Sequence, residues 1–281
     1  MEFVTLNNHV SMPILGYGVF QISDLDQCEQ CVVDAIHVGY RLIDTAQAYG
    51  NEEAVGKAIK RSGVSREEIF ITTKVWISNA GYQKAKESIE TSMSKLQVDY
   101  IDLVLIHQPF NDYYGTYRAL SELQKEGKIR AIGVSNFYPD RLIDMCKYNE
   151  IVPAVNQVEI HPFHQQVEAI EVMKKYGVQP QAWAPFAQGK NDLFTNPTLT
   201  EIGAKYDKSA SQVALRFLIQ KGVSVLPKTV SKERMIQNFE VFDFRLTDEE
   251  VSLIESLDTK ESSFFSHYDP SIVEYITGLS R

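Results

Sequence analysis

The sequence has few cysteines, no long apolar run and no excess of basic residues. Three cysteines in 281 residues are too few for a disulfide framework. No stretch of 18 uncharged apolar residues occurs, and the first residues lack the basic and apolar regions of a signal peptide. A formal net charge of −9 argues against a general nucleic-acid or membrane-surface binder, although a local basic pocket for phosphate remains open. We therefore expect a cytoplasmic monomer without membrane or nucleic-acid partners.

Two of the cysteines, Cys28 and Cys31, have the CxxC spacing of redox and metal sites. They fall within residues 24–38, whose apolar positions recur with the period of an amphipathic helix. The chain offers no second CxxC and no histidine pair with the H-x3–5-H spacing that would complete a zinc site. We interpret the two thiols as incidental residues of a helix and expect no metal site.

Short β-branched apolar runs alternate along the chain with longer stretches of helical period. This alternation is typical of a parallel sheet covered by helices. The eight runs span residues 14–20, 41–45, 69–75, 101–107, 129–135, 154–160, 178–185 and 223–228. Eight such units in about 250 residues favour a closed (β/α)8 barrel. No G-x-G-x-x-G motif follows any run, which disfavours a Rossmann domain.

Both chain ends add elements to this repeat. Residues 1–16 include a β-hairpin with Asn7 and Asn8 at its turn, which would plug the bottom of the barrel. A start resembling a capping box at Thr247 predicts one more helix, and residues 258–281 form a C-terminal tail or loop. The predicted fold is α/β, a single (β/α)8 TIM barrel domain over residues 1–281 with an N-terminal β-hairpin and an extra C-terminal helix.

Ionisable side chains end three neighbouring predicted strands, at the face where barrels of this kind carry their active sites. Asp44 ends the second strand and Tyr49 follows it, while Lys74 ends the third and His107 the fourth. A nearby ammonium lowers the pKa of a phenol, so the pattern predicts that Tyr49 donates a proton to an oxygen that His107 orients. Taken alone, each residue has an ordinary structural explanation, such as a helix cap for Asp44. Their convergence on one rim favours carbonyl reduction.

The surrounding motifs resemble those of the aldo-keto reductase superfamily. The motifs are DTAQAYGNE (44–52), the lysine of ITTKVW, the histidine of LVLIHQP, GVSNF (133–137), NQVE (156–159) and LPKTVSKERMIQNFEVFDF (226–244), and the match spans about residues 5–257. The resemblance implies an NADPH-dependent oxidoreductase that reduces aldehydes and ketones to alcohols. Its catalytic residues would be Asp44, Tyr49, Lys74 and His107, with Tyr49 as the general acid. Related steroid double-bond reductases replace the histidine with glutamate, so His107 favours carbonyl reduction.

The resemblance also implies contacts with NADPH or NADP+. The positions that match the nicotinamide site are Ser135, Asn136, Gln157 and Trp183, of which the last would stack on the ring. The positions that match the adenosine end are Lys228, Thr229, Arg234, Gln237 and Asn238. Because the first three of these match the residues that bind the 2′-phosphate, we expect NADP(H) to be preferred over NAD(H).

Three places depart from the commonest pattern of the family. Gln108 stands where a tryptophan often follows the histidine. Ala184 and the pair Ala187-Gln188 stand where serine and glycine are frequent near the pyrophosphate. None of these changes removes one of the four catalytic candidates.

The sequence indicates less about the substrate pocket than about the catalytic residues. Phe20, Trp76, His107 and Phe110 are expected to line it because they follow the first, third and fourth strands. The C-terminal tail FFSHYDPSIVEYITGLSR (264–281) is a candidate to cover part of the pocket. This tail is short beside those of mammalian steroid-reducing relatives. The pocket would then resemble that of microbial members that act on small aldehydes, methylglyoxal or keto sugars.

Two other functions stay open at this point. An NADPH-binding redox-sensing or regulatory subunit with little turnover would not need a proton donor at Tyr49. An unrelated barrel isomerase or hydrolase that uses His107 and Glu159 would bind no dinucleotide.

Overall fold

Eight parallel strands form a sheet that closes on itself. The structure, a computed structural model, describes residues 1–279, and the strands of this sheet neighbour one another in sequence order. They are β3 (Tyr17–Gly18), β4 (Leu42–Asp44), β5 (Phe70–Val75), β6 (Ile101–Ile106), β7 (Ile129–Ser135), β8 (Val155–Glu159), β9 (Gln179–Trp183) and β10 (Ser224–Val225). The Gly16 N–H donates to the Val225 carbonyl (2.9 Å), and the Val225 N–H donates to the Ile14 carbonyl (2.8 Å). These bonds join the last strand to the first, which confirms the predicted (β/α)8 barrel.

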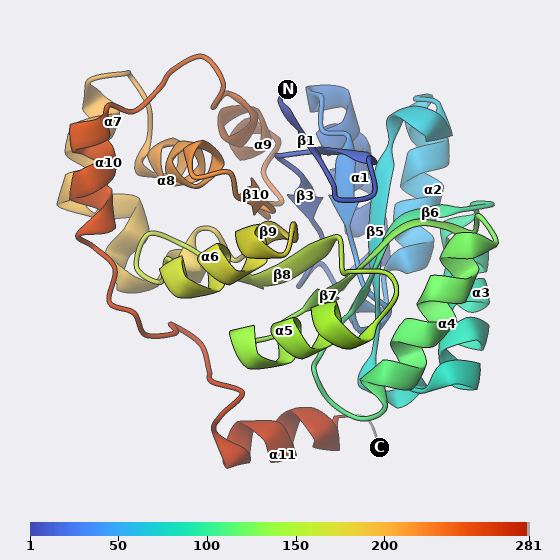
Figure 1. Cartoon of the computed structure of the whole chain (residues 1–281). Helices are drawn as coiled ribbons and strands as arrows, with labels where there is room; N and C mark the ends of the chain where they lie inside the picture. The colour runs from blue at the N-terminus through green and yellow to red at the C-terminus, as the bar shows by residue number, and fades with distance from the viewer. Residues whose placement is uncertain (280–281) are drawn as a thin grey trace.

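Helices surround the sheet, as Figure 1 shows. They are α1 (Leu25–Val38), α2 (Glu52–Ser62), α3 (Tyr82–Leu96), α4 (Tyr113–Lys125), α5 (Pro139–Tyr148), α6 (Val167–Lys175), α7 (Pro197–Ala204), α8 (Ala210–Gln220), α9 (Lys232–Phe239), α10 (Asp248–Glu255) and α11 (Pro270–Gly278). Ser209 and Thr247 begin α8 and α10 with capping boxes, so the extra helix predicted at Thr247 is confirmed. Within residues 1–279, no helix is long and apolar enough to cross a membrane.

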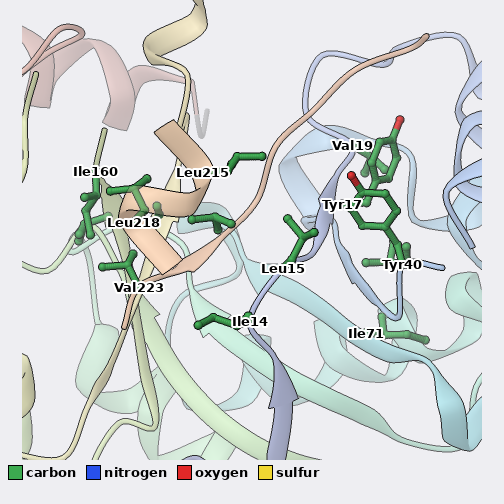
Figure 2. Close-up of a cluster of buried hydrophobic side chains, with 14 of the residues drawn as sticks. Ile14, Leu15, Tyr17, Val19, Tyr40, Ile71, Ile160, Leu215, Leu218 and Val223 are labelled. Atoms are coloured by element: carbon green, nitrogen blue, oxygen red, sulfur yellow. The ribbon is translucent and has the colours of Figure 1, made fainter. Parts of the chain in front are cut away.

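The main core lies between the sheet and the helices. In Figure 2, Ile14 and Leu15 occupy the space between Leu218 of α8 and the rings of Tyr17 and Tyr40. The two tyrosine rings meet edge to face, with centroids 5.8 Å apart, and both are almost wholly buried. Because helices bury the outer face of each strand and packed side chains fill the inside, the strands read as nearly continuous apolar runs.

The N-terminal hairpin closes the amino-terminal end of the barrel. Its strands, β1 (Phe3–Thr5) and β2 (Ser11–Pro13), pair antiparallel. Met12 is wholly buried in an inner cluster with side chains of the barrel strands. The Asn7 and Asn8 side-chain amides donate to the carbonyls of Pro153 (3.0 Å) and Arg130 (2.9 Å), at the starts of two strands. The predicted plug is therefore confirmed.

The tail contains a helix that the sequence analysis did not predict. Helix α11 begins with Asp269, whose side chain accepts a hydrogen bond from the Ser271 N–H (2.9 Å), and with Pro270 in its first turn. Both signals stand in the sequence, but the helix is short, and its apolar side chains Ile272, Val273 and Ile276 pack only against the barrel rim. In Figure 1 this helix lies at the opposite end of the barrel from the hairpin.

The CxxC pair faces the interior of the protein from α1. Cys28 and Cys31 are both buried and form no disulfide. Burial raises the pKa of the Cys28 thiol to about 12. Because redox and metal chemistry need the thiolate, this environment supports their interpretation as residues of the helix core.

Candidate active site

A cavity of about 820 Å³ opens at the carboxyl ends of the barrel strands. Its wall includes Asp44 from β4, Ser135 from β7 and Trp183 from β9, together with Tyr49 and His107 from the loops after β4 and β6. This is the end at which parallel barrels hold their chemistry, while the hairpin seals the other end. The predicted catalytic residues therefore converge on one concave site.

Lys74 lies at the centre of the polar contacts in this site. Its Nζ donates to Asp44 Oδ1 (2.6 Å), to the Thr45 carbonyl (2.9 Å) and to the Tyr49 hydroxyl (3.4 Å). The side chain has no exposed surface, so these oxygens replace the water that the ammonium loses. Burial alone would lower the pKa of Lys74, but the Asp44 carboxylate and the Tyr49 hydroxyl outweigh it and raise the pKa. The lysine therefore stays charged.

Tyr49 is brought over Lys74 by a single turn of 3-10 helix, Gln47–Tyr49. Gly50 ends the turn at φ 69°, a left-handed conformation that costs glycine little. The side chain of Gln47 fixes the turn to the next loop, since its Oε1 accepts from the Trp76 N–H (3.0 Å) and from Asn79 Nδ2 (2.8 Å). The five-residue separation of Asp44 and Tyr49 thus places both beside the same ammonium.

The net pKa shift of Tyr49 differs from the sequence prediction. Burial raises the pKa of the phenol above its ordinary value, and the Lys74 ammonium opposes this shift without reversing it. The expected lowering by lysine is present, but the lost hydration of the phenolate is the larger effect. Tyr49 is consequently protonated at neutral pH, which is the state that a proton donor needs.

His107 is a neutral imidazole in the cavity wall. Burial, with a smaller effect from the Lys74 ammonium, holds its pKa well below the ordinary value. The ring contacts Tyr49 and Trp76 edge to face, at centroid distances of 5.6 and 5.0 Å. Its Nδ1 is buried and has no hydrogen-bond partner within residues 1–279. A proton there would be a buried donor without an acceptor, so we assign the proton to Nε2, where it can be donated to a bound oxygen.

The four predicted nicotinamide residues all line the cavity. Trp183 Nε1 donates to Asn136 Oδ1 (2.9 Å), and Asn136 Nδ2 donates to the His107 carbonyl (3.1 Å) and to Ser135 Oγ (3.2 Å). Gln157 Nε2 donates to Asp44 Oδ2 (2.9 Å) and to Gln181 Oε1 (2.8 Å). Both amide hydrogens of Gln157 are therefore used, and its Oε1 remains as an acceptor for an amide N–H from a ligand.

The predicted adenosine residues lie in the loop after β10 and on α9, and only Lys228 among them reaches the cavity wall. Arg234 lies in the first turn of α9, which Ser231 caps by accepting from the Arg234 N–H (3.3 Å). Lys228 and Arg234 are exposed and form no ion pair within residues 1–279, whereas Lys232 on the same helix pairs with Asp34 (3.1 Å). Thr229, Gln237 and Asn238 lie beside them, outside the cavity. Two exposed cations near a helix start suit a phosphate.

The backbone is left-handed at the two alanines that depart from the family pattern. Ala184, which lines the cavity, has φ 48°, and Ala187 has φ 49°. Residues with a side chain adopt this conformation at a cost that glycine avoids. Alanine at these two positions therefore carries local backbone strain.

The substrate side of the cavity is only partly as predicted. Phe20, Trp76 and His107 line it, but Phe110 does not. Phe110 lies behind the wall, packed in a small apolar cluster with Ile276 of α11. Its place directly after β6 predicted a position in the wall, but in the fold α11 packs over it.

Further residues line the cavity, several of them from the tail that was a candidate to cover it. They are Gln108 and, from the tail, Phe264, Phe265, Tyr275, Ile276 and Leu279, with Gln21, Ala48, Ala184, Pro185, Phe186, Gln188, Phe194, Gly18 and Leu226. Phe264 and Phe265 contact the Trp183 ring at centroid distances of 5.3 and 6.1 Å. The tail thus forms one wall of the cavity.

Glu159 holds this tail in place. Its carboxylate accepts from Ser262 Oγ (2.5 Å) and from the Ser263 N–H (2.8 Å), and it contacts His161 Nε2 (2.9 Å). Burial alone would raise the pKa of Glu159, but these hydrogen bonds outweigh burial and lower it. Glu159 therefore has a structural role in holding the tail. This role disfavours a hydrolase or isomerase that would use Glu159 as a base.

Known proteins match the chain over nearly its whole length. A model of the Aldo/keto reductase family matches residues 15–259. Glyoxal reductase of Bacillus subtilis is 48% identical over 261 residues, which cover 92% of this chain and 94% of that protein. An aldo-keto reductase from a Medee basin deep-sea metagenome library superposes with a TM-score of 0.92 at 43% identity, covering 95% of this chain and 98% of its own. An aldo-keto reductase of Bombyx mori in complex with NADP gives a TM-score of 0.90 at 33% identity, with 97% and 96% covered.

Removing one charge of the buried Asp44–Lys74 ion pair should lower the stability of the fold strongly. Asp44→Asn keeps the size of the side chain but leaves the Lys74 ammonium without a carboxylate, and we expect the free energy of unfolding to fall by about 3–5 kcal/mol. Urea unfolding followed by circular dichroism measures this. The control is Glu53→Gln, which removes an exposed pair with Lys57 (2.8 Å) and should change stability little. Equal effects of the two substitutions would contradict the account of the buried pair.

Proposed function

The chain belongs to the aldo/keto reductase family, and from this premise we propose that Tyr49 is the proton donor in its reduction of carbonyl compounds. The enzyme is an NADP(H)-dependent oxidoreductase that reduces aldehydes and ketones to alcohols. The observation that carries the proposal is the contact of Lys74 Nζ with both Asp44 and Tyr49. The cavity beside these residues also holds a neutral His107.

Each of the four residues has a distinct task in this proposal. Tyr49, protonated at neutral pH, donates its proton to the carbonyl oxygen as negative charge develops there. The Lys74 ammonium stabilises the phenolate that Tyr49 becomes, and Asp44 keeps the ammonium charged and in place. His107 donates from Nε2 to the same oxygen and orients it.

The residues present fit a nicotinamide dinucleotide. Gln157 Oε1, with both amide hydrogens of that residue already used, supports binding of a carboxamide N–H, and the Trp183 ring offers a flat face. Lys228 and Arg234 supply positive charge for a 2′-phosphate. Bound NADPH supplies the hydride for the carbonyl carbon.

The cavity supports small carbonyl substrates. Its volume of about 820 Å³ must also take part of the cofactor, and its substrate side is aromatic, from Phe20, Trp76, Phe264 and Phe265. A relative that is 48% identical is named for glyoxal. We propose small aldehydes and ketones, among them 1,2-dicarbonyl compounds, as the substrate class. A redox sensor without turnover is not favoured, because the curated relatives are named as reductases and dehydrogenases.

Removing the Tyr49 hydroxyl tests its role as general acid. We expect Tyr49→Phe to lower kcat for aldehyde reduction by at least about 100-fold, since general acid catalysis contributes about that much or more. NADPH oxidation at 340 nm measures turnover, and quenching of protein fluorescence should show that NADPH still binds. The control is Tyr148→Phe, which removes a hydroxyl from an exposed tyrosine outside the cavity and should leave kcat unchanged. Substantial turnover by Tyr49→Phe would refute the proposal.

Removing the Arg234 guanidinium tests recognition of the 2′-phosphate. Arg234→Ala should raise KM for NADPH at least about tenfold and change KM for NADH little, because only NADPH carries the phosphate. Steady-state kinetics with both cofactors measure this, and Lys232→Ala, which removes a lysine paired with Asp34, is the control. Equal increases in KM for NADPH and NADH would contradict the assignment of Arg234 to the 2′-phosphate.

We further propose that the whole chain acts as one domain and as a cytoplasmic monomer. Its three thiols are buried and form no disulfide, as expected in a reducing compartment. Light scattering after size exclusion should give the mass of one chain, 31.9 kDa. A mass twice as large would exclude the monomer.

A further inference from the structure

Gln108 is the residue next to His107, and it lines the same cavity. It stands where a tryptophan often occurs in the family, so the change replaces a large apolar surface with a carboxamide. The side chain is only 8% exposed. A buried amide needs partners for its oxygen and nitrogen, so its contacts indicate what it can still bind.

The oxygen of this amide is held by a residue of the tail. Gln108 Oε1 lies 2.7 Å from His267 Nε2. The backbone N–H of His267 donates to the Tyr138 hydroxyl (3.0 Å). The His267 ring packs against Phe110 and Tyr138, both at a centroid distance of 5.4 Å. The family match ends at residue 259, so His267 lies beyond the matched residues.

The protonation of His267 fixes the direction of this hydrogen bond. Burial, with a smaller effect from Arg141, lowers the pKa of His267 to about 4, so the ring is neutral at physiological pH and carries one proton. Its Nδ1 is buried without a hydrogen-bond partner within residues 1–279. A proton on Nδ1 would be a stranded donor, so the proton is on Nε2 and is donated to Gln108 Oε1.

The nitrogen of the amide is left to the cavity. Gln108 Nε2 has no hydrogen-bond partner within residues 1–279, yet it is not among the side-chain atoms that are closed off from solvent. Two N–H donors therefore remain toward a cavity whose substrate side holds Phe20, Trp76, Phe264 and Phe265. A ligand oxygen that reaches them gains a hydrogen bond that a hydrocarbon group cannot make.

We propose that Gln108 determines substrate specificity: its amide N–H groups, oriented by His267, bind a second oxygen next to the carbonyl that is reduced. The favoured substrates are then 2-oxo and 2-hydroxy aldehydes rather than unsubstituted aldehydes of the same length. This inference rests on the proposed function and names a residue that discriminates within its substrate class. Since Gln108 and His267 are separated by 159 positions in sequence, the tail selects substrates through an amide in the barrel rim.

Substituting Gln108 by leucine tests the proposal with two substrates of three carbons. Gln108→Leu keeps the approximate size and removes the donors, so kcat/KM for methylglyoxal should fall about three- to tenfold, while kcat/KM for propanal should change less than about twofold. NADPH oxidation by the full chain measures both. A merely structural role would lower kcat/KM for methylglyoxal and for propanal by the same factor. An unchanged ratio of these two kcat/KM values would overturn the proposal.

A second variant keeps the test valid if Gln108→Leu fails to fold. His267→Phe preserves the ring but removes the hydrogen bond to Gln108 Oε1, and it should lower the same ratio through KM for methylglyoxal; an unchanged ratio would count against the proposal. Propanal turnover by the unaltered chain tests the proposed function separately. An unaltered chain that reduces both aldehydes, with variants that lower both values equally, would refute the role of Gln108 and leave the proposed function intact.

Discussion

The wholly buried ammonium of Lys74 is the constraint on which the site depends. A charge without access to water is costly unless oxygens surround it, and here Asp44, Thr45 and Tyr49 supply them. The remaining oxygen of Asp44 accepts from Gln157 (2.9 Å). One carboxylate therefore ties the lysine to a residue of the proposed cofactor site. The same contacts that make the charge tolerable also set the positions of the proposed proton donor and of the nicotinamide site.

A second buried carboxylate shows that burial of charge alone does not mark an active site. Asp102, at the start of β6, accepts from Arg66 (2.6 Å), from Arg130 (2.6 Å) and from the Ile71 N–H (2.9 Å). Its oxygens are satisfied by strong fixed donors, and it lies at the hairpin end of the barrel, where side chains serve stability. Asp44 differs because its partner, Lys74, also contacts a hydroxyl that faces a cavity.

The sequence allowed the barrel and the cluster of catalytic candidates to be predicted because both follow from local order. Strand ends meet at one face of a parallel barrel, so Asp44, Lys74 and His107 had to converge once the strands were recognised. The net pKa shift of Tyr49 could not be foreseen, since it depends on how completely the folded chain removes water from the phenol. Helix α11 and the position of Phe110 depend on how the tail packs on the rim, which no periodicity encodes.

The barrel and the C-terminal tail contribute different parts of the site. The barrel strands and the loops directly after them supply every residue of the proposed proton transfer, and hydrogen bonds within the core hold Lys74 and Asp44 in place. The tail supplies Phe264 and Phe265 to the cavity wall, and its hydrogen bonds to the barrel include those to Glu159 through Ser262 and to Gln108 through His267. Lys190, in the loop after β9, adds another by donating to the Ser263 carbonyl (2.5 Å). Because none of these tail contacts involves Lys74 or Tyr49, the wall can differ between relatives without disturbing the buried charge on which the chemistry depends.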